Sequence, residues 1–416
     1  MADVPFELDL SLQVGKYDIR RQLGKGATGT VYLAVDTFTG REVALKVIEP
    51  EVFRDPQFGT VYRTQFLNEA SLAGKLRHPH IVGILDAVVQ EDSGYIAMEC
   101  VMGGDLSKHA TPDTLLPVAD VLQMIFKCCG ALDYAFHEGI VHRDIKPANI
   151  MIAQGTDVKI ADFGAALLRK AQAVQTASIG SPHYMSPEQM EDQPLTHHSD
   201  MYCLGVALYE LLTGRRPFEA DTLEVLVQKV MHQDPAPPSS VRPELPKEID
   251  RVVLRALCKK PEDRYATWAE FAGELSKLVT LVLPPGAISD SEKFVSLKRV
   301  EMLSSLSDAE LWELAGAGRW TRVVARQQIL RESDPGKSFF FLARGQARVT
   351  RHGRLLNTID ERECFGEMAY IRGGELPRHA TVESVTDVLL AEFEPETLAR
   401  MSIGAQYYLM RALVRN

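Results

Sequence analysis

One stretch of this sequence decides the fold: His142-Arg143-Asp144-Ile145-Lys146-Pro147-Ala148-Asn149, closely followed by Asp162-Phe163-Gly164. Together the two segments place an acid, a cation and two metal-binding side chains at a spacing that suits phosphoryl transfer. Asp144 can accept a proton from a hydroxyl nucleophile, and Lys146 can reach the phosphate in transfer. Asn149 and Asp162 offer hard oxygen ligands to Mg²⁺. A polar loop between two strands is the alternative, and it leaves this combination unexplained.

The first segment resembles the catalytic loop of protein kinases, and the second resembles their metal-binding loop. Lys146-Pro147-Ala148 is similar to the serine/threonine branch of that family, not the tyrosine branch. The resemblance implies a bilobal α+β fold, with Asp144 and Lys146 in catalysis and with Asn149 and Asp162 as ligands of Mg²⁺. It also implies ATP as the phosphoryl donor and protein substrates with serine or threonine acceptors.

A glycine-containing segment near the N-terminus fits this prediction. Gly24, Gly26 and Gly29 lie between two β-rich runs, and glycines let backbone amides approach phosphate groups. An ordinary hairpin turn has a similar composition. The next strand carries Lys46, which the resemblance places against the α- and β-phosphates of ATP. A single strand lysine is usually solvated, but the order of these motifs along the chain favours the binding role.

The same resemblance supplies the rest of the ATP site. Met98-Glu99-Cys100-Val101 resembles the hinge against which adenine stacks, although an apolar Met98 would also suit the core of another fold. The implied ATP site comprises Gly24, Gly26, Gly29, Val31, Ala44, Lys46, Met98, Glu99 and Val101.

Residues 64–75 carry apolar side chains at helical spacing, which predicts an amphipathic helix. Glu69 lies on this helix, and we expect it to form an ion pair with Lys46 and so to serve catalysis. The alternative is a surface glutamate in an intrahelical pair, worth only about 0.3–0.5 kcal/mol.

The segment after Gly164 resembles the activation segment of a kinase. Residues 172–179 contain hydroxyl groups and few large apolar side chains, and Ser186-Pro187-Glu188 resembles the end of such a segment. A phosphate on Thr176 or Ser178 would bring nearly two negative charges, which Arg143 can receive and which can order a loop. The alternative is a polar loop without modification.

Two structural roles follow from the same resemblance. Glu188 is expected to pair with Arg264, and Asp200 with Gly205 is expected to begin the helix that braces the catalytic loop. Changes at these positions are expected to harm folding as much as catalysis.

Composition favours a soluble, cytoplasmic enzyme. The 416 residues predict two or three domains. The six cysteines include no Cys-x-x-Cys pair, which disfavours disulfides and zinc and favours a reducing compartment. Residues 1–16 show no signal peptide, and the apolar run 278–283 is too short to span a bilayer, so no membrane insertion is expected.

The net charge of −10 is unevenly distributed. From residue 292 onward 18 Lys and Arg balance 17 Asp and Glu, so the acidity belongs to the preceding part of the chain. An acidic catalytic domain disfavours nucleic acid as a partner and weakly favours basic peptide substrates.

Pro284-Pro285-Gly286 marks a break in the helical patterning. It predicts a linker (281–291) and a second domain (292–416). The expected parts before it are an N-terminal extension (1–15) and a kinase domain (16–280). Two helices are expected in the second domain, at 294–303 and at 308–316, the latter with Ser307 as N-cap. Short strands separated by glycine turns then predict a small barrel or jelly roll. The expected strands cover 322–330, 338–342, 347–351 and 354–359.

Residues 364–370 and 377–382 resemble the phosphate-binding cassette of cyclic-nucleotide-binding domains, as in regulatory subunits of cyclic-AMP-dependent kinase. A short helix after Gly366 would turn backbone amides toward an anion. Glu367 can accept from a ribose 2′-hydroxyl, and Arg378 can clamp the phosphate with two parallel hydrogen bonds. The implied site comprises Gly366, Glu367, Met368, Ala369, Arg378, His379 and Ala380.

Three features of this cassette leave alternatives open. The loop between Glu367 and Arg378 is about two residues longer than the family pattern suggests, and a jelly roll that has lost its ligand would still pack or dimerise. His379 stands where cyclic-GMP binders tend to carry threonine, which slightly favours cyclic AMP. A C-terminal helix over 395–414 offers Tyr407, Tyr408 and Met410 as a lid over the base or as simple core.

The resulting hypothesis is a serine/threonine kinase, similar to the eukaryotic-like kinases of bacteria, whose activity a cyclic nucleotide modulates. Two other classes remain open. One is a constitutive kinase with a docking or dimerisation module. The other is a pseudokinase scaffold, which Lys46, Asp144, Asn149 and Asp162 together disfavour.

Overall fold

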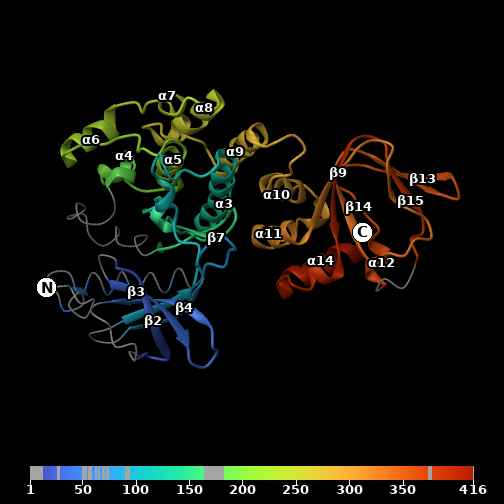
Figure 1. Cartoon of the computed structure of the whole chain (residues 1–416), viewed down its shortest axis with the longest axis horizontal. Coiled ribbons are helices and arrows are strands. Elements are labelled where there is room, and N and C mark those ends of the chain that lie inside the picture. The colour runs from blue at the N-terminus through green and yellow to red at the C-terminus, as the bar shows by residue number, and fades with distance from the viewer. Residues whose placement is uncertain are drawn as a thin grey trace. The chain divides into compact units, whose positions relative to one another are not determined.

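The computed structural model describes residues 13–25, 29–48, 54, 59–60, 63, 66–67, 71, 75–89, 94–163, 182–372 and 377–415. The chain divides into two compact units, Met1–Leu278 and Val279–Asn416 (Figure 1). Each unit has a core of its own. Within the described ranges, no helix combines the length and the apolar character that a membrane crossing requires.

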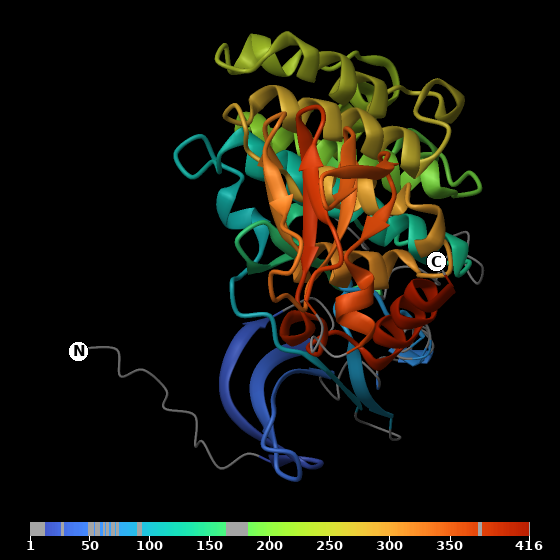
Figure 2. The same ribbon diagram turned by 90° about the vertical axis from the view of Figure 1, so that its right-hand side faces the viewer.

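Unit 1 begins with a six-stranded antiparallel sheet, which we call the small lobe. Its strands, in the order β1-β2-β3-β4-β6-β5, form the blue part of Figures 1 and 2. Alternating apolar residues of β2, β3, β4 and β6 form one packed cluster that includes Tyr17, Ala34 and Leu45. The strands are β1 (Gln13–Val14), β2 (Tyr17–Lys25), β3 (Gly29–Asp36), β4 (Glu42–Ile48), β5 (Ile84–Val89) and β6 (Gly94–Glu99).

The rest of unit 1, the helical lobe, is built around two buried helices, α3 (Val118–His137) and α5 (His197–Thr213). Thr196 and Ser199 form a capping box at the start of α5. Gly214 ends this helix at a φ of 73°, where a Cβ atom would lie only 2.4 Å from the backbone nitrogen of Pro112. The other elements are α4 (Pro187–Met190), α6 (Leu223–His232), α7 (Pro238–Val241), α8 (Lys247–Ala256), α9 (Trp268–Val282) and the hairpin β7 (Ile150–Gln154) with β8 (Asp157–Ile160).

Unit 2 contains two four-stranded antiparallel sheets that form a jelly roll, flanked by helices. One sheet has the order β10-β15-β12-β13 and the other β14-β11-β16-β9. The strands are β9 (Arg319–Val323), β10 (Gln328–Leu330), β11 (Phe339–Arg344), β12 (Ala347–Arg351), β13 (Arg354–Ile359), β14 (Cys364–Phe365), β15 (Thr381–Ser384) and β16 (Val388–Phe393). The helices are α10 (Asp290–Lys298), α11 (Asp308–Ala317), α12 (Glu367–Ile371), α13 (Pro395–Leu398) and α14 (Ile403–Arg415).

The single strand predicted at 322–330 is wrong. The chain leaves one sheet after β9 and enters the other at β10, and Arg326 between them has a φ of 67°. The backbone amide of Arg326 donates to Ser384 in this crossing. A continuous period-2 pattern cannot reveal where a strand changes sheets.

Helix limits in unit 2 also differ from the prediction. The helix predicted at 294–303 begins at Asp290, where Ser289 is the N-cap, and a separate 3₁₀ turn covers Glu301–Leu303. The predicted N-cap role of Ser307 is confirmed, since it forms a capping box with Glu310. The C-terminal helix predicted at 395–414 is two helices, α13 and α14. The helix predicted at 64–75 lies largely outside the described residues.

Candidate catalytic and nucleotide-binding sites

Asp200 of α5 fixes the backbone of the catalytic loop. Its two carboxylate oxygens accept hydrogen bonds from the backbone amides of His142 and Arg143, each at 2.7 Å. Arg143 has a φ of 71°, which is costly for a residue with a side chain. Burial raises the pKa of Asp200, and His142 and the two amide bonds oppose that rise. The predicted bracing of the loop by this helix is confirmed.

Asp144 lies at the centre of a short network. Lys146 Nζ donates to Asp144 Oδ2 at 2.7 Å. The Asn149 amide group donates to the Asp144 carbonyl at 2.7 Å and to Oδ2 at 3.0 Å. These donors hold the carboxylate in one orientation. The three residues that the sequence singled out in this loop therefore meet.

The loop that carries Asp162 is tied to the catalytic loop. Its neighbour Ala161 donates a backbone bond to the Asn149 carbonyl at 2.9 Å and accepts one from His142 Nε2 at 3.0 Å. Asp162 has a φ of 62°, so it too occupies the left-handed region. Lys46 Nζ of β4 lies 3.4 Å from Asp162 Oδ1. The nearby Lys46 charge lowers the pKa of Asp162, so this carboxylate is ionised at neutral pH.

The donor set at this point fits Mg²⁺. Because the Asn149 amide nitrogen donates to Asp144, the amide oxygen on the same planar group is not used in that bond and remains a candidate ligand. Asp162 supplies an ionised carboxylate. Both are hard oxygen ligands, and Mg²⁺ in phosphoryl-transfer sites takes one or two protein ligands plus phosphate oxygens.

The predicted ATP-site residues lie on neighbouring strands. In the register of the sheet, Val31 is opposite Lys46, and Ala44 is opposite Met98. Gly29 is required where β3 meets β4, since a Cβ atom there would lie 2.2 Å from the Val47 carbonyl oxygen. Gly24, by contrast, has open space around its Cα.

The side chain of Glu99 has protein partners. Its Oε2 lies 3.1 Å from Lys159 Nζ and accepts a bond from the Gly83 amide at 3.4 Å. The Glu99 carboxylate is therefore engaged by other parts of the protein, and its role in ATP binding stays a prediction. Val101, two residues after Glu99, is half-buried.

Several predicted residues lie outside the described part of the chain. Their predicted roles stay predictions: Gly26, Glu69, Gly164, Thr176 and Ser178.

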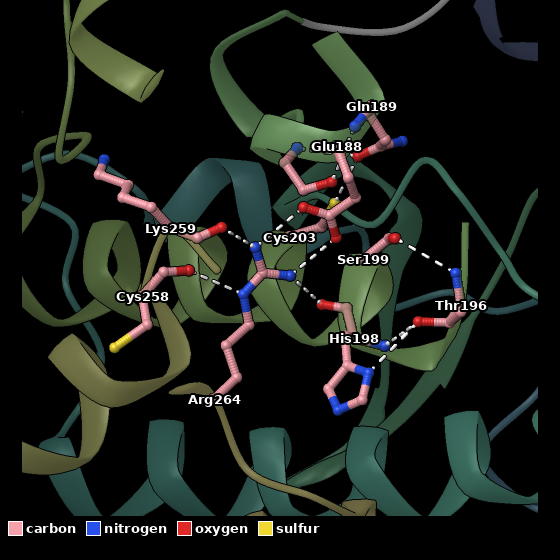
Figure 3. Close-up of polar contacts among 10 residues, drawn as sticks. Glu188, Gln189, Thr196, His198, Ser199, Cys203, Cys258, Lys259 and Arg264 are labelled. Atoms are coloured by element: carbon pink, nitrogen blue, oxygen red, sulfur yellow. Dashed lines mark hydrogen bonds and ion pairs between the residues drawn. The ribbon is translucent and has the colours of Figure 1, made fainter. Parts of the chain in front are cut away.

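The predicted pair between Glu188 and Arg264 is confirmed. Arg264 Nη1 and Nη2 donate to the two oxygens of Glu188 at 2.8 and 2.9 Å (Figure 3). The guanidinium also donates to the carbonyl oxygens of Cys258, Lys259 and His198. It lies at the centre of Figure 3, where it joins the segment before α5 to the loop after α8.

The second candidate site is in unit 2, around Arg378. Gly366 is the N-cap of α12 with a φ of 79°, so the predicted short helix after Gly366 is confirmed. Arg378 is buried, and its Nη1 donates to the Gly366 carbonyl at 3.2 Å. Its Nη2 donates to Ser338 Oγ at 3.1 Å. The predicted phosphate clamp thus contacts the helix start that is expected to face the same phosphate.

Ser338 and Glu392 support Arg378, and sequence reasoning missed both. Ser338 Oγ donates to Glu392 Oε1 at 2.9 Å. Burial lowers the pKa of Arg378, and the Glu392 charge opposes this. Gly336 packs so closely that a Cβ atom there would lie 2.5 Å from Arg378 Nε. No local sequence pattern joins these residues, since they come from different strands and turns.

The other cassette residues are distributed around this centre. Ala369 is buried, Glu367 and Ala380 are half-buried, and Met368 and His379 are exposed. On α14, Tyr407 is 58% exposed, which excludes a core role for it within unit 2.

Comparisons with known families agree with this geometry. Residues 17–274 match the protein kinase domain, and residues 320–402 match the cyclic nucleotide-binding domain. The first match covers more than half of the chain. The chain belongs to the protein kinase family and carries a cyclic nucleotide-binding domain behind its kinase domain.

The similar curated proteins are bacterial serine/threonine-protein kinases. PknB of Mycobacterium leprae is 36% identical over 328 residues, which are 74% of this chain and 52% of that protein. PknB of Mycolicibacterium smegmatis is 38% identical over 288 residues, 67% of this chain and 45% of that protein. The chain spans about half the length of the curated relatives it matches.

Proposed function

We propose that this protein is an ATP-dependent serine/threonine protein kinase whose activity responds to a cyclic nucleotide bound in unit 2. One observation carries the kinase assignment. Asp144, held by Lys146 and Asn149, lies on a loop that is hydrogen-bonded to the Asp162 loop, and Asp162 faces Lys46. The naming of the similar proteins as serine/threonine kinases supports the choice of acceptor.

The proposed reaction uses Asp144 to align the acceptor hydroxyl and to take its proton as the oxygen attacks the γ-phosphorus of ATP. The bond from phosphorus to the bridging oxygen breaks, and the electron pair stays on ADP. Lys146 neutralises charge on the transferred phosphoryl group. Lys46 contacts the α- and β-phosphates, and Gly24, Gly26 and Gly29 let backbone amides approach them.

Asn149 and Asp162 are the residues that would hold Mg²⁺, which neutralises the phosphate oxygens when it is bound. Glu69 is proposed to pair with Lys46. Phosphorylation of Thr176 or Ser178 is proposed to order the segment that precedes Glu188 through Arg143.

In unit 2 we propose that Arg378 and the start of α12 bind the cyclic phosphate and that Glu367 accepts from the ribose 2′-hydroxyl. The buried guanidinium and its contact with Gly366 support this assignment. Cyclic AMP is slightly favoured over cyclic GMP because His379 replaces the threonine expected of cyclic-GMP binders. We place the protein in the cytoplasm, where its six free cysteines would stay reduced.

The coupling between the two units is expected to be graded. An allosteric coupling of about 1–3 kcal/mol changes affinity or activity some 5–150-fold, whereas a complete switch requires about 5.5 kcal/mol. The boundaries proposed for the parts are 1–15, 16–280, 281–291 and 292–416.

The test measures phosphate transfer to a serine-containing peptide by the full chain, with and without saturating cyclic AMP or cyclic GMP. Transfer that changes severalfold with one nucleotide supports the proposal. Calorimetry with both cyclic nucleotides on wild type and Arg378→Ala distinguishes a nucleotide-binding domain from a docking module. If wild type binds neither nucleotide, unit 2 is a docking or dimerisation module and the kinase is constitutive. If no transfer occurs under any condition, the kinase assignment fails.

A further inference from the structure

Two neighbouring cavities lie in the helical lobe, and the smaller of them adjoins the catalytic loop. The smaller, about 370 Å³, borders on Lys146, Ala148 and Tyr184, and the larger has a volume of about 520 Å³. They share two lining residues, His183 and Arg216. Because Lys146 contacts Asp144, the smaller cavity lies beside the place where an acceptor residue would bind. A peptide substrate would therefore place a neighbouring side chain in it, an argument that rests on the proposed kinase function.

The wall of the smaller cavity is cationic. Lys146 and Arg216 both line it, and no carboxylate is among its lining residues in the part of the chain that the structure describes. Burial and the Arg216 charge lower the pKa of His183, so the imidazole on this wall is neutral at pH 7. The charged groups among its described lining residues are therefore both positive, and one of them, Lys146, is already paired with Asp144.

The buried carboxylate of Glu210, behind the wall of this cavity, already has two hydrogen-bond donors from the protein. Glu210 of α5 accepts a hydrogen bond from the Tyr184 hydroxyl at 2.5 Å and one from Arg216 Nε at 3.1 Å. Its side chain is only 7% exposed. A basic residue of a substrate would have to displace both partners to reach Glu210. The protein's own Arg216 therefore takes the place that a substrate cation could otherwise fill.

Arg216 retains binding capacity after this contact. A guanidinium has five N–H donors, and Glu210 engages Nε. The two terminal nitrogens form the fork that binds a carboxylate or phosphate through parallel hydrogen bonds. The Arg216 side chain is 33% exposed and lines the cavity, and its guanidinium lies over the Tyr184 ring.

The larger cavity shows where an anion would be disfavoured. Glu219 and Asp221 line it, and Lys229 Nζ there donates to the Glu219 carbonyl at 2.8 Å. These acids would repel an anionic group at that end. The preference for an anion is therefore confined to the smaller cavity, within reach of the acceptor site.

We propose that Arg216 selects protein substrates that carry an anionic side chain, either a carboxylate or a phosphate group, next to the serine or threonine acceptor. This opposes the preference for basic peptides that the overall acidic charge predicts. The local cations prevail because charges on the distant surface are screened beyond about 8–10 Å at physiological salt. The nearest charges set the specificity.

The test uses the full chain and a set of peptides with one serine acceptor. The two residues before the acceptor and the two residues after it are varied one at a time. At each of these positions the peptides carry glutamate, phosphoserine, glutamine or lysine. Both kcat/KM and equilibrium binding, by fluorescence anisotropy, are measured. At one position we expect glutamate or phosphoserine to exceed glutamine by about tenfold in kcat/KM, mostly through KM, as for one charge-assisted pair in a half-buried site.

Three variants locate the effect. Arg216→Gln should remove the preference, and Arg216→Lys should retain part of it. Arg215→Gln is the matched control, because it removes the same charge from an adjacent, exposed residue that does not line either cavity. Each variant is compared by its own ratio between peptides, so a general loss of stability cancels.

The outcomes separate this inference from the kinase assignment. Equal use of all four side chains, a preference for lysine, or an equal effect of Arg215→Gln overturns it even when the enzyme is active. An enzyme that transfers no phosphate contradicts the proposed function, while the anisotropy series still reports the charge preference. A larger effect of phosphoserine than of glutamate identifies prior phosphorylation as the source of the anion, and the reverse identifies acidic residues.

Discussion

Arg264 and Glu188 form a buried ion pair in which both guanidinium termini meet both carboxylate oxygens, at 2.8 and 2.9 Å. The Arg264 side chain is fully buried and that of Glu188 is 4% exposed. The remaining Arg264 nitrogen binds a backbone carbonyl, so the charge has no unsatisfied donor direction. Removing one partner of such a pair strongly lowers the free energy of unfolding, because a single buried charge is left behind.

Glu188→Ala should destabilise unit 1 by about 3–5 kcal/mol, since it leaves the Arg264 charge buried without its partner. Thermal unfolding followed by circular dichroism measures this, with unit 2 as an internal reference. Glu274→Ala is the control, because its partners Arg251 and Lys277 are both mostly exposed and such pairs contribute only about 0–1 kcal/mol each. Equal losses in the two variants would show that the buried pair has no special role.

The same pair predicts a pH dependence. Burial by itself would raise the pKa of Glu188, but the hydrogen bonds and charge of Arg264 outweigh burial and lower it. Its contribution to stability is therefore complete above the unfolded pKa of about 4.5 and is lost as pH falls through the lower folded value. The difference in melting temperature between wild type and Glu188→Gln should be constant from pH 6 to 8 and should shrink below pH 4.5. A difference that grows on acidification contradicts the assigned sign.

Asp144→Asn should lower kcat by about 10²–10⁴-fold, because the side chain keeps its size and loses the ability to accept a proton. Affinity for ATP should change little, since Asp144 contacts Lys146 and Asn149 and not the strands that carry Lys46. Rapid-quench phosphate transfer and nucleotide titration measure the two effects. A variant that keeps wild-type kcat excludes Asp144 as the base.

Gly336→Ala should weaken cyclic-nucleotide binding about tenfold or more, because the added Cβ would lie 2.5–2.8 Å from three guanidinium atoms of Arg378. The arginine must move, and its bonds to Gly366 and Ser338 break. Gly316→Ala is the control in the same unit, since a Cβ there would meet no atom within 4 Å apart from its chain neighbours and the backbone of its own helix. Isothermal calorimetry compares the two. Unchanged affinity in Gly336→Ala would remove Arg378 from the binding site.

The parts of the fold that sequence predicted well are those set by local contacts. Asp144, Lys146 and Asn149 lie within six positions of one loop, so their contact was predictable from the sequence. The strands over 347–351 and 354–359 were placed correctly because glycine turns delimit them. Ser307 was found as an N-cap because a capping box leaves a signal within four residues.

The missed features depend on residues distant in sequence. Ser338 and Glu392 support Arg378 across two strands, and the Glu210, Tyr184 and Arg216 cluster joins α5 to two loops. The crossing at Arg326 divides one predicted strand because packing of two sheets, not local periodicity, sets the bend. Such contacts require the three-dimensional fold.

The attachment of the catalytic loop to Asp200 has a thermodynamic consequence. Because helix α5 orders the amides of His142 and Arg143 in the absence of any substrate, the entropy of that loop is lost once, during folding, and not again at each turnover. A conformational switch in this protein is then expected to act on the parts around the loop and to leave the loop itself assembled.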